Sequence, residues 1–465
     1  MRVLVVAANT IRYPAPVYPL GAAWVAAALR AAGHEVGLLD LAFARRPAER
    51  LARAVGRQRP GLVALSLRNG DSTAYPSARS FLPRFVDLAR AVRAASPATL
   101  VLGGPAATLY SEAYLRETGA DALVPGEGEI ALPGLCARLD EARSIEGLPG
   151  VLTPGTAGHA RPALAAPAPA DLDALPDPAW DLLPPRRYVR RAGEANFQTK
   201  RGCASRCVYC PGPRRLEGGA LRLMRPEVAV DRLERLARRH GARAVFLVDN
   251  VFNAPADHAK AICAEILRRG LELRWSCQLS PSGFDAELAE LLVRSGCRSG
   301  DFGLDSADDA VLAQLGKPFR HAEIAAAAAA CHAAGLRFCA SLLFGGPGET
   351  PESMQRTVDR IEALGPTAVV AMGGIRILPG TPLERRALAE GRLAAPGAGP
   401  EPVFYVAPEV ADTLLPFLRE VHARYRGWVL PATTPDVAPL WATALRHLGL
   451  KGPLWELLRF QRRET

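Results

Sequence analysis

Short apolar runs alternate with amphipathic stretches over the first 145 residues of the chain. The apolar runs cover residues 3–6, 36–39, 62–65, 100–102 and 122–124. Between them, residues 21–32 and 85–95 carry apolar side chains at the spacing of helices that bury one face. This alternation predicts an α/β domain, a doubly wound, Rossmann-like parallel sheet of five strands.

Small or polar residues follow each of these five predicted strands. In a doubly wound sheet, ligands bind in the crevice at the carboxyl ends of the strands. Glycine allows a backbone to approach a ligand closely, but it also simply permits tight turns. Taken together, the five strand ends predict a ligand crevice formed by residues 8–10, Asp40, and residues 66–69, 103–108 and 126–129.

The rest of the chain divides into three further segments. Residues 146–190 are rich in proline and alanine and are typical of a linker that is stiff in places. Over residues 191–395, strand-like runs near positions 197, 245, 273, 300, 338 and 369 are each followed by a helical pattern, which predicts a partial, six-unit TIM-like parallel barrel. Residues 396–465 contain Trp428, Trp441 and Trp455 and predict a small helical cap.

Three cysteines, Cys203, Cys207 and Cys210, follow the first predicted barrel strand. Nine cysteines in 465 residues make a poor disulfide framework. A closed structural zinc site needs four ligands, commonly as two cysteine pairs, and no partner pair occurs nearby. Three thiolates on one loop instead suit a [4Fe-4S] cluster whose fourth iron is open to an exogenous amine and carboxylate.

Composition and charge limit the classes of partner that we expect this protein to bind. The 57 basic and 47 acidic residues give a net charge of +10, but the arginines are dispersed and have few aromatic residues among them, which disfavours nucleic acid. No apolar stretch approaches the ~20 residues of a membrane helix. The N-terminus also lacks the pattern of a secretory signal, so we expect a cytoplasmic protein without a membrane partner.

The Cys-x3-Cys-x2-Cys spacing, with Tyr209 before the last cysteine, resembles the radical S-adenosylmethionine (SAM) superfamily. A glycine-rich turn after the fifth barrel strand looks like the SAM motif of that superfamily, and Asp305 stands where its members usually have glutamate. The resemblance implies that Cys203, Cys207 and Cys210 bind the cluster. It also implies that SAM is held by Tyr209, Asp305, Ser306, Gly345, Gly346, Pro347, Gly348, Glu349 and Thr350.

A doubly wound domain before such a barrel resembles the cobalamin (B12)-binding subclass of that superfamily, and the resemblance covers nearly the whole chain. No Asp-x-His-x-x-Gly follows the first strand, so no histidine is expected to bind cobalt, and Arg68 is expected to set the cobalt environment. A degenerate domain that has lost cobalamin is the alternative. The cobalamin-binding residues that the resemblance implies are Ser66, Arg68, Asn69, Gly103, Gly104, Pro105, Thr108, Gly126, Glu127, Gly128 and Glu129.

The resemblance implies a methyltransferase that delivers a methyl group from methylcobalamin to an unactivated carbon, or phosphorus, of a small metabolite or peptide. It also implies an external electron donor such as flavodoxin or ferredoxin. A cobalamin-binding enzyme that rearranges, cyclises or oxidises its substrate without methylation is the alternative. An RNA-modifying methylthiotransferase is disfavoured, because it would bring a further three-cysteine domain and only Cys136 precedes the linker.

Several polar and aromatic residues have two interpretations. Asp249, Asn250 and Arg376 are either site residues or hydrogen-bonded polar groups of the barrel. Tyr405, Phe417 and Trp428 either line the substrate pocket or dock the cap onto the barrel. No general base can be named from the sequence.

Overall fold

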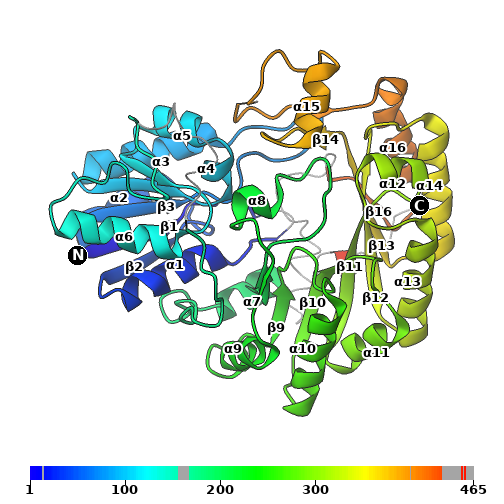
Figure 1. Cartoon of the computed structure of the whole chain (residues 1–465), viewed down its shortest axis with the longest axis horizontal. Helices are drawn as coiled ribbons and strands as arrows, with labels where there is room; N and C mark the ends of the chain where they lie inside the picture. Colours follow the sequence, from blue (N-terminus) through cyan, green and yellow to red (C-terminus); the bar gives the residue numbers. More distant parts are fainter. Residues whose placement is uncertain (13–14, 156–166, 398, 432–451, 454, 457–465) are drawn as a thin grey trace.

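The computed structural model describes residues 1–12, 15–155, 167–397, 399–431, 452–453 and 455–456. Figure 1 shows two parallel sheets side by side, one from each half of the chain. No helix among the described residues is long and apolar enough to cross a membrane.

The first sheet has five parallel strands, as predicted, in the order β2-β1-β3-β4-β5. Helices α1 and α6 cover one face, and α2, α3 and α5 cover the other. The strand order reverses between β1 and β3, which is where a doubly wound sheet binds its ligand. The elements are β1 (Arg2–Ala7), α1 (Leu20–Ala31), β2 (Glu35–Asp40), α2 (Pro47–Gln58), β3 (Leu62–Ser66), α3 (Leu82–Ala95), β4 (Thr99–Gly103), α4 (Pro105–Leu109), α5 (Ser111–Thr118), β5 (Ala122–Val124) and α6 (Gly128–Asp140).

The second sheet is the partial barrel. Its six predicted strands are present, and a seventh, β16 (Trp428–Val429), pairs in parallel with β13. The order is β16-β13-β12-β11-β10-β9-β6. The strands and their outer helices are β6 (Ala195–Phe197), α9 (Pro226–Arg238), β9 (Ala244–Leu247), α10 (Ala256–Arg268), β10 (Arg274–Leu279), α11 (Ala286–Arg294), β11 (Cys297–Asp305), α13 (His321–Ala334), β12 (Arg337–Phe344), α14 (Pro351–Leu364) and β13 (Ala368–Gly373).

Shorter elements complete the described chain. Residues 396–465, expected as a helical cap, contribute strands as well as helix, and Trp441 lies outside the described residues. The sequence predicted helix for this segment and did not predict β15 and β16, because two residues are too few to show an alternating apolar pattern. These elements are α7 (Arg186–Ala192), β7 (Lys200–Arg201), α8 (Gly212–Leu216), β8 (Arg222–Leu223), α12 (Asp309–Gln314), β14 (Ile375–Arg376), α15 (Pro382–Ala389), β15 (Phe404–Tyr405), the 3₁₀ turn η3 (Pro408–Val410) and α16 (Leu414–Arg424).

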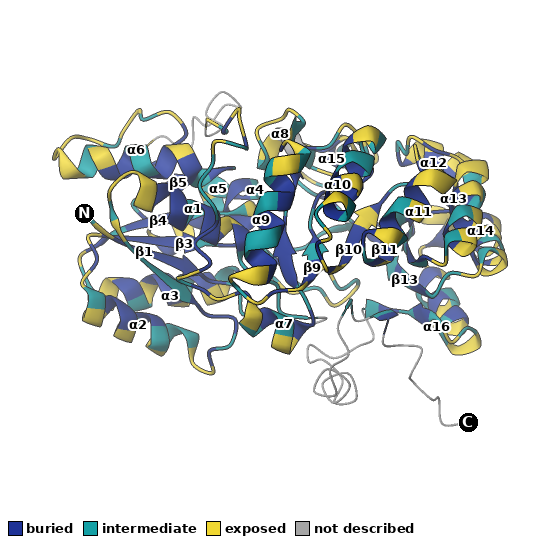
Figure 2. Cartoon of the chain, turned by 90° about the horizontal axis from the view of Figure 1, so that it is seen from below, coloured by how far each residue is buried: buried dark blue, intermediate teal, exposed yellow. Residues whose placement is uncertain are grey.

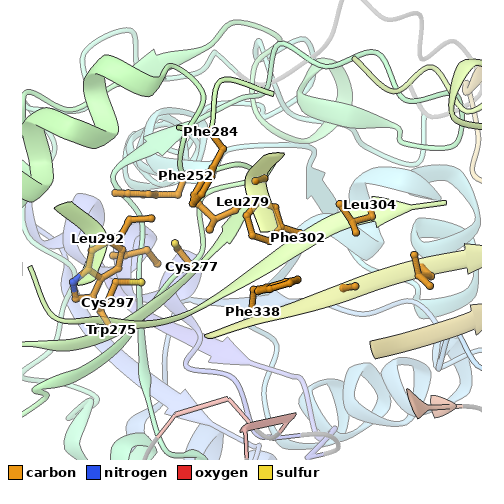
Figure 3. Packing of buried hydrophobic residues seen from close by; sticks show 14 of the residues in the cluster. Phe252, Trp275, Cys277, Leu279, Phe284, Leu292, Cys297, Phe302, Leu304 and Phe338 are labelled. Atoms are coloured by element: carbon orange, nitrogen blue, oxygen red, sulfur yellow. The ribbon is translucent and has the colours of Figure 1, made fainter. Parts of the chain in front are cut away.

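The barrel core lies between its sheet and its outer helices. Figure 3 shows the aromatic part of this layer, in which Phe302 packs edge-on against Phe284 and Phe338, with ring centroids 5.2 and 5.9 Å apart. The helices turn their exposed sides to solvent (Figure 2). Alternation along β11 turns Phe302 and Leu304 into this core, so Asp301 and Gly303 face the barrel interior.

Helix α1 joins the two halves because it belongs to both cores. Its Ala22, Ala26 and Leu29 pack in the first sheet's core, whereas Ala23 and Trp24 belong to the barrel core. The segment before the barrel packs on the same helix, where Ala179 N–H donates to the carbonyl of Ala23 at 3.0 Å. The first sheet is therefore fixed against the barrel by shared packing.

Candidate active site

The three-cysteine loop runs from β7 to α8 and is held on both sides by backbone contacts. Val208 N–H donates to the Leu315 carbonyl at 3.0 Å, and the Val208 carbonyl accepts from Leu383 N–H at 2.9 Å. At Gly202, with φ of +93°, a Cβ would lie 2.4 Å from the Ala220 carbonyl oxygen, so only glycine fits there. The cysteines therefore stand on a defined backbone.

All three cysteines line one cavity at the carboxyl ends of the barrel strands, where parallel barrels place their chemistry. Among the described residues, no three His, Cys, Asp or Glu side chains converge as a single metal ion would require. Three thiols on one loop around a shared cavity fit a cluster with an open corner. The polar side chains that line the same cavity are Ser205, Tyr209, Glu217, Asn250, Gln278, Ser280, Asp301, Asp305, Lys317 and Ser341.

Two of the residues predicted to bind SAM, Tyr209 and Asp305, meet in this cavity. Tyr209 Oη donates to Asp305 Oδ2 at 2.5 Å, and Lys317 Nζ lies 2.8 Å from the same oxygen. Burial, reinforced by the Asp305 carboxylate, raises the pKa of Tyr209 well above its usual value, so the phenol stays a neutral donor. The sequence reasoning missed Lys317, one of only four lysines, because nothing local shows that it reaches Asp305.

The other predicted SAM residues do not line this cavity. Ser306 is fully buried, and its Oγ lies 3.0 Å from Thr357 Oγ1. Gly345 and Gly346 donate their backbone N–H groups to the Glu349 carboxylate. Thr350 caps α14 and Pro351 fills its first turn, as predicted. The N–H groups expected to face SAM are thus already paired, and contact with SAM at Gly345, Gly346, Pro347, Gly348, Glu349 and Thr350 stays a prediction.

The buried Glu349 carboxyl should make stability depend on pH. Burial raises its pKa from 4.5 to about 7, against the opposing effect of the Gly345 and Gly346 N–H groups. A raised pKa in the folded state means that stability is fully present below about 4.5 and is lost as the pH rises through about 7. We expect Glu349→Gln to flatten this fall, measured as melting temperature against pH. The exposed Glu352→Gln is the matched control, and an equal slope in all three proteins would contradict the assignment.

Asp249 and Asn250, at the end of β9, have different roles. Asp249 is fully buried and accepts from Thr199 N at 2.7 Å and from Lys200 N at 3.2 Å, so it is a structural group of the barrel. Asn250 is exposed to the cavity, where its amide donates to Glu217 Oε2 at 2.7 Å. Of the pair, only Asn250 lies where it could touch a ligand.

The predicted cobalamin loops meet at the carboxyl edge of the first sheet. Gly103 and Gly104 pack against the loop after β3: Leu67 N–H donates to the Gly103 carbonyl at 2.8 Å, and a Cβ at Gly104 would lie 2.8 Å from the Leu67 carbonyl oxygen. Pro105 begins α4, and Thr108 lies within that helix. Thr108 Oγ1 donates to the Gly104 carbonyl at 2.9 Å and accepts from Gly126 N–H at 2.8 Å. These glycines shape the edge through contacts with one another.

Arg68 stands apart from this network, with Ser66 and Asn69 half-buried beside it. Its side chain is exposed to water, while the surrounding protein lowers the pKa of the guanidinium by desolvation. Among the described residues, no carboxylate pairs with it. Arg68 is therefore an exposed cation beside the loops predicted to hold cobalamin. Such a cation beside glycine-shaped loops fits a large cofactor rich in amide groups.

Glu127 and Glu129 point to the barrel, not into a crevice of their own domain. Arg201 is buried and binds Glu127 through Nη1 at 2.5 Å and Glu129 through Nη2 at 2.7 Å. Arg222, its cross-strand partner on β8, also binds Glu127. Gly128 lies tightly against Val25 of α1. Both carboxylates predicted to contact cobalamin are therefore occupied by arginines that flank the cysteine loop.

Arg376 also bridges the two halves. Its Nε lies 2.9 Å from Asp71 Oδ2, beyond the loop after β3, and its Nη2 donates to Tyr110 Oη at 2.9 Å.

The aromatic residues of the C-terminal segment dock that segment onto the barrel. Phe417 and Trp428 pack on Phe344, with ring centroids 6.2 and 6.3 Å away. Tyr405 donates to Glu390. None of these three aromatic residues lines the cysteine cavity.

Comparison with known proteins agrees with this arrangement. Residues 6–136 match the B12-binding domain model and residues 197–361 match the radical SAM superfamily model. An uncharacterized methyltransferase of Pyrococcus horikoshii is 27% identical over 344 residues, 73% of this chain and 72% of its own length. The tryptophan 2-C-methyltransferase of Streptomyces laurentii is 29% identical over 426 residues, 78% of this chain and 71% of its own length.

The fold of the whole chain is that of a solved radical SAM methyltransferase, TsrM from Kitasatospora setae, with a TM-score of 0.85 and 24% identity over 99% of this chain and 97% of that one. The two matched domains coincide with the two sheets, and the cysteine loop lies where the second match begins. The chain is therefore a member of the cobalamin-binding radical SAM superfamily, an enzyme whose cofactors are a [4Fe-4S] cluster, SAM and cobalamin.

Proposed function

We propose that this enzyme is a cobalamin-dependent methyltransferase that transfers a methyl group from SAM to a carbon atom of a small molecule. The observation that carries the proposal is the pairing of Glu127 and Glu129 with Arg201, which holds the carboxyl edge of the first sheet against the cysteine loop. Methyl transfer between two cofactors and a substrate needs all three reacting groups held together. Its relatives named as methyltransferases support the same reaction.

When bound, the cofactors supply the difficult chemistry: the cluster supplies the electron that cleaves SAM, and cobalamin carries the methyl group. The chain itself positions them. Cys203, Cys207 and Cys210 would hold three irons and leave the fourth to SAM, beside Tyr209 and Asp305. Lys317 holds the Asp305 carboxylate in place, because its Nζ lies 2.8 Å from Asp305 Oδ2.

The electron donor belongs to the proposal as well. An open-corner cluster needs reduction from outside, and reduced flavodoxin or ferredoxin is the donor class we propose. Donor identity is checked by comparing SAM cleavage with reduced flavodoxin, reduced ferredoxin and a chemical reductant.

The function is tested with SAM carrying a labelled methyl group, using the anaerobically reconstituted full chain. Tryptophan is the first substrate to test, because a relative is named for it. Label in the product supports methyl transfer. Deoxyadenosine formed together with an altered but unlabelled product would favour the alternative, a rearrangement, cyclisation or oxidation.

Arg68 is predicted to act on the cobalt environment. Replacing Arg68 with alanine removes a cation beside the predicted cobalamin loops, so we expect a changed cobalamin absorption spectrum and about tenfold slower turnover, the scale of one lost charge-assisted contact. Arg53→Ala, on the outer side of α2, is the surface control. An unchanged spectrum together with unchanged turnover would show that Arg68 is only a solvated loop residue.

A further inference from the structure

We propose that Asp301, with Gln278 and Ser341 beside it, is the binding site for a positively charged amine of the substrate. The inference deepens the proposed function and rests on it, since it assigns the substrate class of the same cavity. It concerns three side chains in the middle of the barrel wall to which neither the cysteine motif nor the SAM motif gives a role.

The three residues form a polar row across adjacent strands. Gln278 on β10 is the register partner of Asp301 on β11, and paired residues of a parallel sheet face the same side. Ser341 on β12 donates its hydroxyl to Asp301 Oδ1 at 2.7 Å. All three line the cavity that the three cysteines line. The row is thus within reach of a molecule bound at the cluster end of the barrel.

The row is open to water although it lies on central strands. Gln278 is exposed and Asp301 and Ser341 are half-buried, whereas Leu279, Phe302 and Leu342, the next residues along, are buried on the other face. A central strand that only served packing would have no reason to place a carboxylate and an amide on its inner side. These side chains therefore face a space that a ligand can enter.

Among the carboxylates that line the cavity, Asp301 has no positively charged partner within the described residues. Asp305 is paired with Lys317, and Glu217 is bound by the amide groups of Gly202 and Asn250. In the described part of the chain, Ser341 is the one hydrogen-bond donor to Asp301, and no lysine or arginine lies within ion-pair distance of it. Asp301 lines the cavity, and no group of the described residues donates a hydrogen bond to its second oxygen, Oδ2. A partly buried carboxylate that has one hydrogen bond and no cationic partner is stabilised by a ligand that carries a positive charge.

The protonation of Asp301 is consistent with this assignment. Burial raises its pKa to about 6, with Ser341 opposing the shift. A protonated amine placed beside Oδ2 would lower that pKa and complete the ion pair, and the amide oxygen of Gln278 would accept a second N–H of the same group. Substrates with a primary or secondary amine are the class that this row recognises.

The test uses equilibrium binding to the reconstituted full chain, with three amines and their alcohol counterparts: tryptamine and tryptophol, phenethylamine and phenethyl alcohol, pentylamine and pentanol. We expect at least one amine to bind about ten to one hundred times more tightly than its alcohol, and Asp301→Asn to remove that difference. Asp359→Asn, an exposed residue of α14, is the matched control. If no amine binds more tightly than its alcohol, the proposal is wrong.

Two further measurements distinguish an amine site at Asp301 from a contact with SAM and from methyl transfer itself. An aza analogue of SAM should bind equally well to the wild type and to Asp301→Asn, and a parallel loss of its affinity would mean that Asp301 serves SAM instead. The labelled-methyl assay decides the function independently. Amine binding without labelled product would refute methylation but not this site, and methylation of a neutral substrate by both proteins would refute this site but not methylation.

Discussion

Replacing any one of Cys203, Cys207 and Cys210 with alanine is expected to abolish the reductive cleavage of SAM. A cluster with three protein ligands and one open corner cannot lose another ligand and still hold SAM at a defined iron. We expect iron and sulfide content to fall sharply and deoxyadenosine formation to disappear. Cobalamin binding should survive, because its loops lie on the other sheet.

Cys331→Ala is the matched control, since Cys331 is buried in α13 away from the cavity and should leave the iron content unchanged. In the wild type, adding SAM should change the spectrum of the cluster, because SAM binds the open iron. Recovery of zinc instead of iron and sulfide, or a spectrum indifferent to SAM, would contradict the assignment of the loop.

Arg201→Ala is expected to be the most destabilising single substitution at the contact between the two halves. Its side chain is 6% exposed and pairs with the carboxylates of Glu127 and Glu129, whose side chains are 6% and 4% exposed. Removing it leaves Glu127 with Arg222 and takes from Glu129 the arginine that binds it, and a buried charge that loses its partner costs about 3–5 kcal/mol. We expect a matching loss in the free energy of unfolding, measured by urea denaturation.

The matched control for Arg201 is Arg225→Ala, an exposed arginine paired with Asp173 in the same region, which should change stability little. If Arg201→Ala fails to fold, the double variant Glu127→Gln and Glu129→Gln keeps the volume of both side chains and tests the same pairing. Equal effects of Arg201→Ala and Arg225→Ala would show that the buried pairs contribute nothing to the contact.

Apolar runs and their spacing were enough to predict the five strands of the first sheet and six of the seven strands described in the second, because most of these strands bury apolar side chains. They could not predict β16, since Trp428 and Val429 are too few residues to show a period. These two residues form a strand because they pair with β13, which is distant in sequence, and not because of their own secondary-structure propensity.

The cysteines, Tyr209 and Asp305 were predicted together because one loop and one strand end carry them. The roles of Glu127, Glu129 and Glu349 depend on partners that sequence spacing does not reveal. A glycine-rich turn predicts free backbone N–H groups, but only the fold shows that Glu349 accepts from two of them. Asp301 could be seen in the sequence as a charged residue on a predicted central strand, but its neighbours Gln278 and Ser341 became apparent only from the pairing of β11 with β10 and β12.

Because helix α1 belongs to both cores, the barrel depends on the first half of the chain for part of its packing. Trp24 lies in the barrel core, with the guanidinium carbon of Arg232 5.1 Å from its ring centre. A barrel cut free of residues 1–140 would lose this tryptophan and open one flank of its interior to solvent. We therefore expect the catalytic half to depend on the first half for its stability, so the two should be expressed and engineered as one piece.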